Sequence, residues 1–404
     1  MTEKALTANS GSYRVNSIDV LRGIIMIIMA IDHTRDFFHS EAMKPNHNPL
    51  DPADPFLWFT RWITNFCAPT FVFLSGISAW LAAQKRSKNE ATMFLIKRGL
   101  WLVVAEVVIV TFGIFFNPHY NSILLQVIWV IGWSMVLLGI LSRISVKLVL
   151  AIGILLFAGH NIVDHINGLP PRFSPQAQWL DLLWRGITFI PIDSEHRLLV
   201  FYQILPWASA MFVGYGIAHW FHKDFNPATR RKYLLWLGTA MIVVFVVLRA
   251  FTNYGNPQPW VRTDGFVTNF LNFLNTSKYP PSLQFLCMTL GPSCIALALF
   301  EKVKMGWTKV VAVYGKVPFF YYILHFYILH LVVVACFYAE GYGSDAIRPS
   351  PEVFFPLWFR PIEFGYNLGV VYLIWFLLIV LLYFPCRWFA KYKKTHRQWW
   401  LSYV

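Results

Sequence analysis

Several ionisable side chains interrupt the apolar segment "DVLRGIIMIIMAIDHTRDFFH", which runs from Asp19 to His39. In an α-helix with 3.6 residues per turn, Asp19, Arg22, His33 and Asp36 fall on one stripe. This stripe presents a carboxylate and a guanidinium near one end, and an imidazole and a carboxylate near the other. Charged groups on such an apolar helix are costly to bury and usually functional, so we expect the stripe to carry chemistry.

These residue types favour recognition of an anion at one end of the helix and proton transfer at the other. Eleven residues separate Arg22 from His33, which corresponds to a helical rise of about 16 Å. A guanidinium binds phosphate groups, and an imidazole can act as a general base or as a nucleophile. Asp36 lies one turn from His33 and could orient its ring, while Asp32 and His39 lie on a neighbouring face.

Structural alternatives apply to the same residues. Asp19 and Arg22 could form an interfacial ion pair that only sets the membrane topology, and a single histidine near a helix end is often structural. The spacing of His33, Asp36 and His39 also suits metal ligands, but no HExxH motif or cysteine pair accompanies it, so we expect no metal. The presence of both charged pairs on one stripe favours the functional interpretation.

The helix that carries this stripe is expected to be the first of about ten membrane-spanning helices. The chain is 57% hydrophobic and only 13% charged, whereas a soluble domain usually carries about 25% charged residues. Apolar runs of nearly twenty residues recur along the whole length, which is typical of membrane helices. We therefore predict an all-α, polytopic helix bundle with spans at 18–38, 57–83, 93–116, 123–141, 145–163, 198–220, 233–252, 282–301, 310–338 and 366–388.

The distribution of basic residues predicts the orientation of the bundle. Lys and Arg concentrate in the segments that share a side with the N-terminus, so the positive-inside rule predicts that both termini are cytoplasmic. We expect one integral-membrane domain over residues 1–404, with a cytoplasmic N-terminal segment at 1–17 and a basic cytoplasmic tail at 389–404. Because this bias and contacts to lipid headgroups account for the net charge of +14, nucleic acid is not an expected partner.

Further polar residues lie within or near the predicted spans and could line the same cavity. Lys97 and Arg98 lie near the cytoplasmic end of the third span, where they would add positive charge for a phosphate-bearing ligand. His325 lies in the middle of the ninth span. The remaining candidates, each of which alone is more often structural than functional, are Asn65, Ser75, Gln203, Lys278 and Tyr322.

Six segments of the chain carry a resemblance to a known family. They are "SIDVLRGIIMIIMAIDH", "NFCAPTFVFLSGISAWLA", "FLIKRGLWL", "ILPWASAMFVGYGIA", "SKYPPSLQFLCMTLGP" and "YGKVPFFYYILHFYILH". In this order they resemble the bacterial branch of the membrane acyltransferases that are similar to heparan-alpha-glucosaminide N-acetyltransferase. The spacing from Arg22 to His33 also looks like the signature of the related acyltransferase type 3 family. The resemblance covers nearly the whole chain.

The resemblance implies an acyl-CoA-dependent transmembrane acyltransferase. Its donor would be cytoplasmic acyl-CoA, expected to be acetyl-CoA, and its acceptor a carbohydrate or glycoconjugate on the other side of the membrane. The expected CoA site comprises Asp19, Arg22, Lys97 and Arg98. The expected catalytic residues are Asp32, His33, Asp36 and His39.

The identity and role of the catalytic histidine stay open at this point. In the family the catalytic histidine lies further into the first outer loop than His33, so His39 or His47 could match it. Such a histidine could act as a base or as an acyl carrier.

The expected setting is the bacterial cytoplasmic (inner) membrane, with the lipid bilayer as a partner and with a homo-oligomer as an option. The alternative function is a proton-coupled membrane transporter in which Asp, Glu and His form a proton relay. The chain lacks the paired broken helices and the similar halves that secondary transporters tend to have.

Overall fold

The computed structural model describes residues 15–44, 54–252, 254–350, 353, 355–396 and 398–402. The α-helices are α1 Asn16–Phe38, α2 Pro55–Thr64, α3 Cys67–Ala83, α4 Lys88–Ala105, α5 Thr111–Phe115, α6 Val127–Ile144, α7 Val146–Gly159, α8 Gln178–Leu180, α9 Ile204–Ile217, α10 Pro227–Phe251, α11 Phe266–Leu274, α12 Leu283–Phe300, α13 Gly306–Lys316, α14 Pro318–Ala339 and α15 Leu368–Thr395. A π-helical turn, Glu106–Val110, joins α4 to α5, and a second one follows α8 at Asp181–Arg185. Short 3-10 helices lie at His160–His165, Pro175–Ala177, Ala218–Phe221, Ser344–Ala346 and Trp399–Ser402.

Each predicted span contains helical structure, although the spans predicted at 123–141 and 198–220 begin in strands. Within the described part of the chain, 7 helices are long and apolar enough to cross a membrane. They are Pro55–Ala83, Val127–Ile144, Val146–His165, Pro227–Phe251, Leu283–Phe300, Pro318–Ala339 and Leu368–Thr395. The charged α1 is not among them, so the number of about ten crossings and their orientation stay predictions.

Several predicted boundaries differ from the observed elements. The span predicted at 198–220 begins with a strand, and its helix α9 starts only at Ile204. The span predicted at 310–338 consists of two helices, because the backbone leaves the helical conformation at Val317, directly before Pro318. The tail predicted at 389–404 is helical at first, since α15 continues to Thr395.

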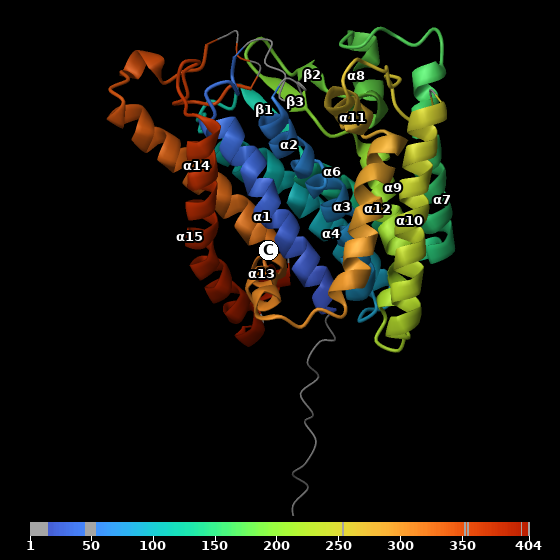
Figure 1. Cartoon of the computed structure of the whole chain (residues 1–404). Coiled ribbons are helices and arrows are strands. Elements are labelled where there is room, and N and C mark those ends of the chain that lie inside the picture. Colours follow the sequence, from blue (N-terminus) through green and yellow to red (C-terminus); the bar gives the residue numbers. More distant parts are fainter. Residues whose placement is uncertain are drawn as a thin grey trace, which may run out of the picture.

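A small β-sheet departs from the prediction of an all-α fold. Its strands are β1 Ser122–Leu125, β2 Thr188–Pro191 and β3 Arg197–Val200, in the order β1-β3-β2. β1 runs parallel to β3, with Ser122 opposite Arg197, and β2 is antiparallel to β3. These segments are too short to span a membrane, and their backbone groups find partners in one another instead. The sheet lies at the upper edge of the molecule in Figure 1.

Helix α1 crosses the centre of the bundle (Figure 1) and contacts α3, α12, α13, α14 and α15. Its N-terminal end and the C-terminal end of α15 lie at the lower edge in Figure 1, as the predicted topology requires. We call this edge the lower edge and the opposite one the upper edge. The stripe predicted from the sequence therefore lies inside the protein, with its Arg22 end toward the lower edge.

Two glycines allow α1 and α13 to cross closely. A Cβ atom on Gly315 would lie 1.9 Å from the backbone oxygen of Asp19, and one on Gly23 would lie 2.1 Å from the backbone oxygen of Val311. No other residue type fits these distances without a shift of the backbone. The crossing fixes the position of the first turns of α1, which carry Arg22.

Candidate functional site

The guanidinium of Arg22 is held by contacts from its own helix α1 and from two neighbouring helices, α13 and α3. Its Nη1 donates to the Gly315 oxygen at 3.1 Å and lies 3.6 Å from a carboxylate oxygen of Asp19. Its Nη2 donates to the Ser78 hydroxyl of α3 at 2.6 Å. The predicted pair of Asp19 and Arg22 is therefore present, and contacts from α3 and α13 fix its geometry.

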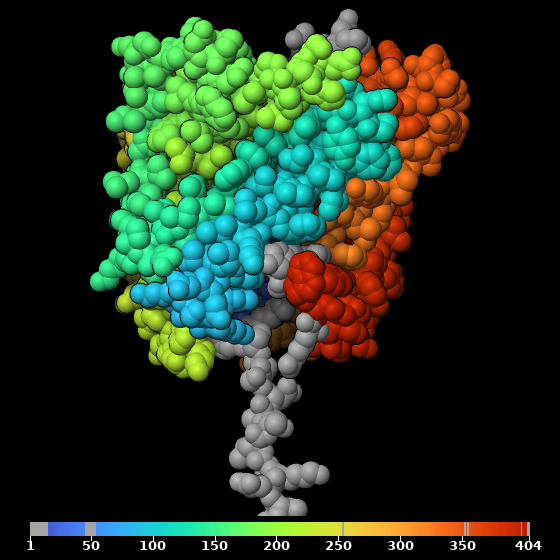
Figure 2. Space-filling view, turned by 180° about the vertical axis from the view of Figure 1, so that it is seen from behind, coloured from blue at the N-terminus to red at the C-terminus, as the bar shows by residue number. Residues whose placement is uncertain are grey.

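Arg22 lines a cavity of about 160 Å³ in the lower half of the molecule, which we call the Arg22 cavity. Among the described residues its lining includes four cations, Arg22, Arg98, Lys316 and Lys393. The elements that carry two of them, α4 and the end of α15, both lie in the lower half of the face seen in Figure 2, in light blue and dark red. This charge suits a ligand with several phosphate groups.

Three of the residues predicted from the sequence line this cavity, namely Arg22, Arg98 and Ser75 of α3. Lys97 is exposed and lies outside the lining. Lys316 and Lys393 were missed because they are far apart in the sequence, at the end of α13 and in the last turns of α15.

A second, smaller cavity of about 40 Å³ surrounds His33, and we call it the His33 cavity. Its lining brings together four of the predicted residues, Asp32, His33, Lys278 and Tyr322. Thr64, Gln126 and Tyr202, which the sequence did not single out, also contribute polar groups to its wall. The lining therefore combines a carboxylate, an imidazole, an ammonium group and two phenols.

The imidazole of His33 is bonded to a second imidazole. Its Nδ1 lies 2.7 Å from Nε2 of His325, and Nδ1 of His325 lies 3.2 Å from the Tyr321 oxygen. A carbonyl oxygen only accepts, so the His325 Nδ1 carries a proton and its Nε2 has a lone pair. The Nδ1 of His33 then donates, and the hydrogen-bond network leaves a lone pair on the His33 Nε2.

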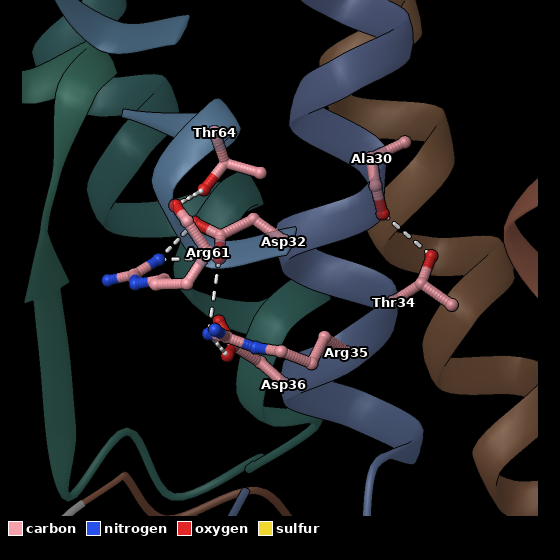
Figure 3. Close-up of polar contacts among 7 residues, drawn as sticks. All are labelled: Ala30, Asp32, Thr34, Arg35, Asp36, Arg61 and Thr64. Atoms are coloured by element: carbon pink, nitrogen blue, oxygen red, sulfur yellow. Dashed lines mark hydrogen bonds and ion pairs between the residues drawn. The ribbon is translucent and has the colours of Figure 1, made fainter. Parts of the chain in front are cut away.

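The carboxylate of Asp32 is the centre of an ion cluster that joins α1 to α2 (Figure 3). Nη1 of Arg61 lies 2.5 Å from both of its oxygens, and Nη2 of Arg35 lies 3.1 Å from one of them. Arg35 also bonds Asp36 at 2.5 Å. Asp36, suggested by the sequence as the partner that orients His33, is thus bound to Arg35, and His325 bonds the His33 ring.

Arg61 was missed in the sequence, although it carried a detectable signal. It is a single cation within the aromatic segment "FLWFTRWITNF". A charge in such an apolar segment needs a buried partner, and Asp32 supplies it. The cluster fixes the last turns of α1, and with them the direction of His33.

His39 ends the first helix outside both cavities. Its oxygen accepts a hydrogen bond of 2.7 Å from Arg360, which also donates to the Phe37 oxygen at 3.1 Å. Burial lowers the pKa of Arg360 to about 10, so the guanidinium stays charged at neutral pH. His47, the other alternative base, lies outside the described residues.

The remaining predicted cavity residues occupy nearby helix ends without lining either cavity. Asn65 is buried at the end of α2. Gln203 is buried directly before α9, and its side-chain nitrogen donates to the Phe201 oxygen at 3.2 Å.

The same four helices, α1, α3, α6 and α14, line both cavities. On α1, Arg22 lines the Arg22 cavity and His33 lines the His33 cavity. On α14, Phe319 lines the Arg22 cavity and Tyr322 lines the His33 cavity. One residue of α3, Phe71, lines both cavities. The two cavities therefore follow one another along a single column through the bundle.

A third cavity of about 670 Å³ lies among the loops near the upper edge. Polar side chains and Trp260 line it, and so does Tyr279. Lys278 lines the His33 cavity, and the next residue, Tyr279, lines this third cavity. The two cavities are therefore neighbours along one loop. This places a large polar space beside the upper end of the column.

The outer surface of the bundle is apolar, in contrast to this interior. In the most apolar 18-residue stretch of each helix, only 28% of α10 and 17% of α15 are buried inside the protein. The exposed side chains of these helices include Val243, Phe251, Phe376 and Phe384. An apolar exterior around internal polar cavities is typical of an integral membrane protein.

The family model described as "Heparan-alpha-glucosaminide N-acetyltransferase, catalytic" matches residues 14–250. The chain belongs to this family, which confirms the resemblance found in its sequence motifs. The match includes α1, α3 and α6 but ends before α14, which carries His325. No curated protein matches the chain. Membership of the family implies acetyltransferase activity in general.

Proposed function

We propose that this protein transfers an acetyl group from acetyl-CoA, bound in the Arg22 cavity, to a sugar-like acceptor that reaches the His33 cavity from the opposite side. The observation that carries the proposal is the column of two cavities with shared walls. Four cations of a kind that suits phosphate groups lie at one end, and an imidazole lies at the other. The separation between the Arg22 cavity and His33 suits acetyl-CoA, because the pantetheine arm of this donor is long and its charge is confined to the nucleotide end.

In this mechanism, an amine or hydroxyl of the acceptor attacks the thioester carbonyl carbon. The lone pair of His33 Nε2 takes the acceptor proton as the new carbon–nitrogen or carbon–oxygen bond forms. The carbon–sulfur bond then breaks, and the leaving thiolate receives that proton and departs as CoA. His33 returns to its first state, and the products are acetylated acceptor and free CoA.

An acetyl-histidine route uses the same residues. The lone pair of His33 would attack the thioester first, and the acceptor would displace the imidazole in a second step. Both routes need the same tautomer of His33, with its proton on Nδ1. A burst of CoA release without acceptor would favour the two-step route.

The remaining residues have supporting roles in the proposal. Lys278 and Tyr322 line the His33 cavity and could stabilise the negative charge that develops on the thioester oxygen. Asp32 is a positioning residue, since its oxygens are bound to Arg61 and Arg35. The acceptor would approach through the large polar cavity beside Tyr279, which offers room for a glycan.

The test is binding and transfer with purified protein and labelled acetyl-CoA. His33→Gln is expected to lower transfer by about 10²-fold or more while CoA affinity is kept, because only proton transfer is lost. The matched control is His119→Gln, which changes an exposed histidine outside the column. Wild-type protein that neither binds CoA nor transfers acetyl groups would exclude the proposal, and so would flux of a solute that does not depend on CoA.

Arg22→Ala is the complementary test at the other end of the column. A lost charge-assisted hydrogen bond is worth about 1.5–3 kcal/mol, so CoA affinity should fall roughly 10- to 100-fold. Arg98→Ala and Lys97→Ala separate a residue in the cavity wall from its exposed neighbour. Equal CoA affinity in the wild type and in the Arg22 and Arg98 variants would place the donor elsewhere.

A further inference from the structure

The face of α3 toward the column consists of small side chains with one exception. In the His33 cavity α3 contributes Cys67 and Ala68, and in the Arg22 cavity it contributes Ser75, Ser78, Ala79 and Ala82. These residues recur every three or four positions, so they form one stripe along the helix. Phe71 lies in the middle of that stripe.

Phe71 occupies the boundary between the two cavities. It lines both of them and is only partly buried, whereas its neighbours Val72, Phe73 and Leu74 are fully buried in the core. A ring in this position has cavity on each side along the axis of the column. In the observed conformation the ring is therefore part of the wall that divides one column into two cavities.

The His33 cavity is small compared with the groups that the proposed reaction must place in it. Its volume is about 40 Å³, against about 160 Å³ for the Arg22 cavity. A longer acyl chain needs more room beside His33 than an acetyl group does, and the boundary at Phe71 is where the column could supply that room.

We propose that Phe71 is the residue that closes the passage between the two cavities and thereby restricts the transferred acyl group to a short chain. This inference rests on the proposed function. The pantetheine arm has to displace the ring to bring the thioester to His33, and the ring then packs against the arm. The rest of the stripe is small, so Phe71 is the side chain of α3 whose size decides how wide this passage is.

The experiment compares transfer from acetyl-, butyryl- and hexanoyl-CoA in wild-type protein, Phe71→Leu and Phe71→Ala. One methylene in an apolar pocket changes specificity by about 10-fold or more. The ratio of kcat/KM for hexanoyl-CoA to that for acetyl-CoA should therefore rise at least about tenfold in Phe71→Ala and less in Phe71→Leu. Phe71→Trp, which enlarges the ring, should lower acetyl transfer while CoA itself still binds.

Phe319→Ala is the matched control, because it removes the same ring from the wall of the Arg22 cavity alone. Its preference for acetyl over hexanoyl groups should stay that of the wild type, whatever its affinity for CoA. Binding of CoA by each variant shows that it is folded, and Phe71→Leu keeps the test available if the alanine variant is unstable.

The outcomes separate the inference from the proposed function. If Phe71→Ala and Phe71→Leu bind CoA, transfer acetyl groups and keep the wild-type chain-length ratio, Phe71 does not set the acyl size and the inference is wrong. If the wild type itself neither binds CoA nor transfers, the proposed function fails first. A changed ratio in Phe319→Ala equal to that in Phe71→Ala would also contradict a special role of Phe71.

Discussion

At the scale of single residues, the bond between His33 and His325 determines which nitrogen of His33 can react. The two imidazoles share one hydrogen-bonded proton, and the backbone oxygen of Tyr321 holds the orientation of the His325 ring. In catalytic triads a second group holds the imidazole in its productive tautomer in this way. In the proposed mechanism His325 is therefore a positioning residue, and an imidazole would fill the role that a carboxylate fills in hydrolase triads.

Replacing His325 should therefore impair the reaction without impairing donor binding. In His325→Phe the proton of His33 can move to Nε2, which removes the base, so kcat should fall by about 10²- to 10⁴-fold. The KM for acetyl-CoA should change little, because the Arg22 cavity is untouched. Steady-state kinetics with purified protein measure both constants.

His325→Gln is the informative companion, since its side-chain oxygen can still accept a hydrogen bond from His33. It should recover part of the activity that the phenylalanine variant loses. Equal losses in both variants, or a large rise of KM in either, would show that His325 acts through packing alone.

At the scale of the helices, the crossing of α1 and α13 connects packing to ligand binding. Gly315 touches the backbone of α1, and its oxygen also accepts a hydrogen bond from Arg22. The end of α13 lies directly before the break at Val317, where the chain turns into α14. The same short segment therefore sets the position of the Arg22 guanidinium and the start of the helix that carries His325.

We expect Gly315→Ala to destabilise the protein and to weaken CoA binding together. The added Cβ would lie 1.9 Å from the Asp19 oxygen, and such overpacking costs about 1–3 kcal/mol. Thermal unfolding in detergent and a CoA titration measure the two effects. Gly306→Ala is the control at the other end of α13, where a Cβ meets nothing within 4 Å. Similar behaviour of the two variants would argue against a tight crossing.

The sequence predicted the helices well because their signal is local. Length, apolar composition and the spacing on α1 indicated the positions of the spans and the shared face of Arg22 and His33. The π-helical turn at Glu106, the break at Val317 and the three-stranded sheet were not predicted. The sheet and the hydrogen bonds around Glu106 depend on partners that are distant in the chain, whereas the break at Val317 has a local signal in Pro318.

Glu106 illustrates this limit. Its carboxylate lies inside the third predicted span and has no partner among its neighbours in the sequence. In the folded chain its Oε1 accepts a hydrogen bond of 2.8 Å from the backbone nitrogen of Gln126. Likewise, His325 becomes the partner of His33 only when α14 packs on α1, so periodicity could indicate a mid-span histidine but not its role.

At the scale of the whole molecule, the column has a direction. The cations lie toward the edge that holds the start of α1 and the end of α15, and the large polar cavity lies toward the other edge. A donor and an acceptor could thus use opposite faces of the membrane. Binding of the donor from the cytoplasm requires the predicted topology, in which the lower edge in Figure 1 is cytoplasmic.

Labelling of single introduced cysteines tests that topology. Ser194→Cys, in the exposed loop between β2 and β3, should react with a membrane-impermeant maleimide on intact cells. Asp224→Cys, in the exposed turn before α10, should react only after permeabilisation. The native cysteines give a low background, since Cys67, Cys287, Cys294 and Cys386 are buried and Cys336 is partly buried. The reverse labelling pattern would mean that the bundle has the opposite orientation, with the cations of the Arg22 cavity toward the outer side of the membrane.

The unbroken helix α1 has a consequence for how this protein can vary. It carries the guanidinium and the imidazole on one rigid rod, so their separation is set by a fixed number of peptide units. One inserted or deleted residue between them would rotate His33 by about 100° around the rod and direct it away from its ring partner. Relatives that keep this arrangement can therefore change the side chains in this segment, but not its length.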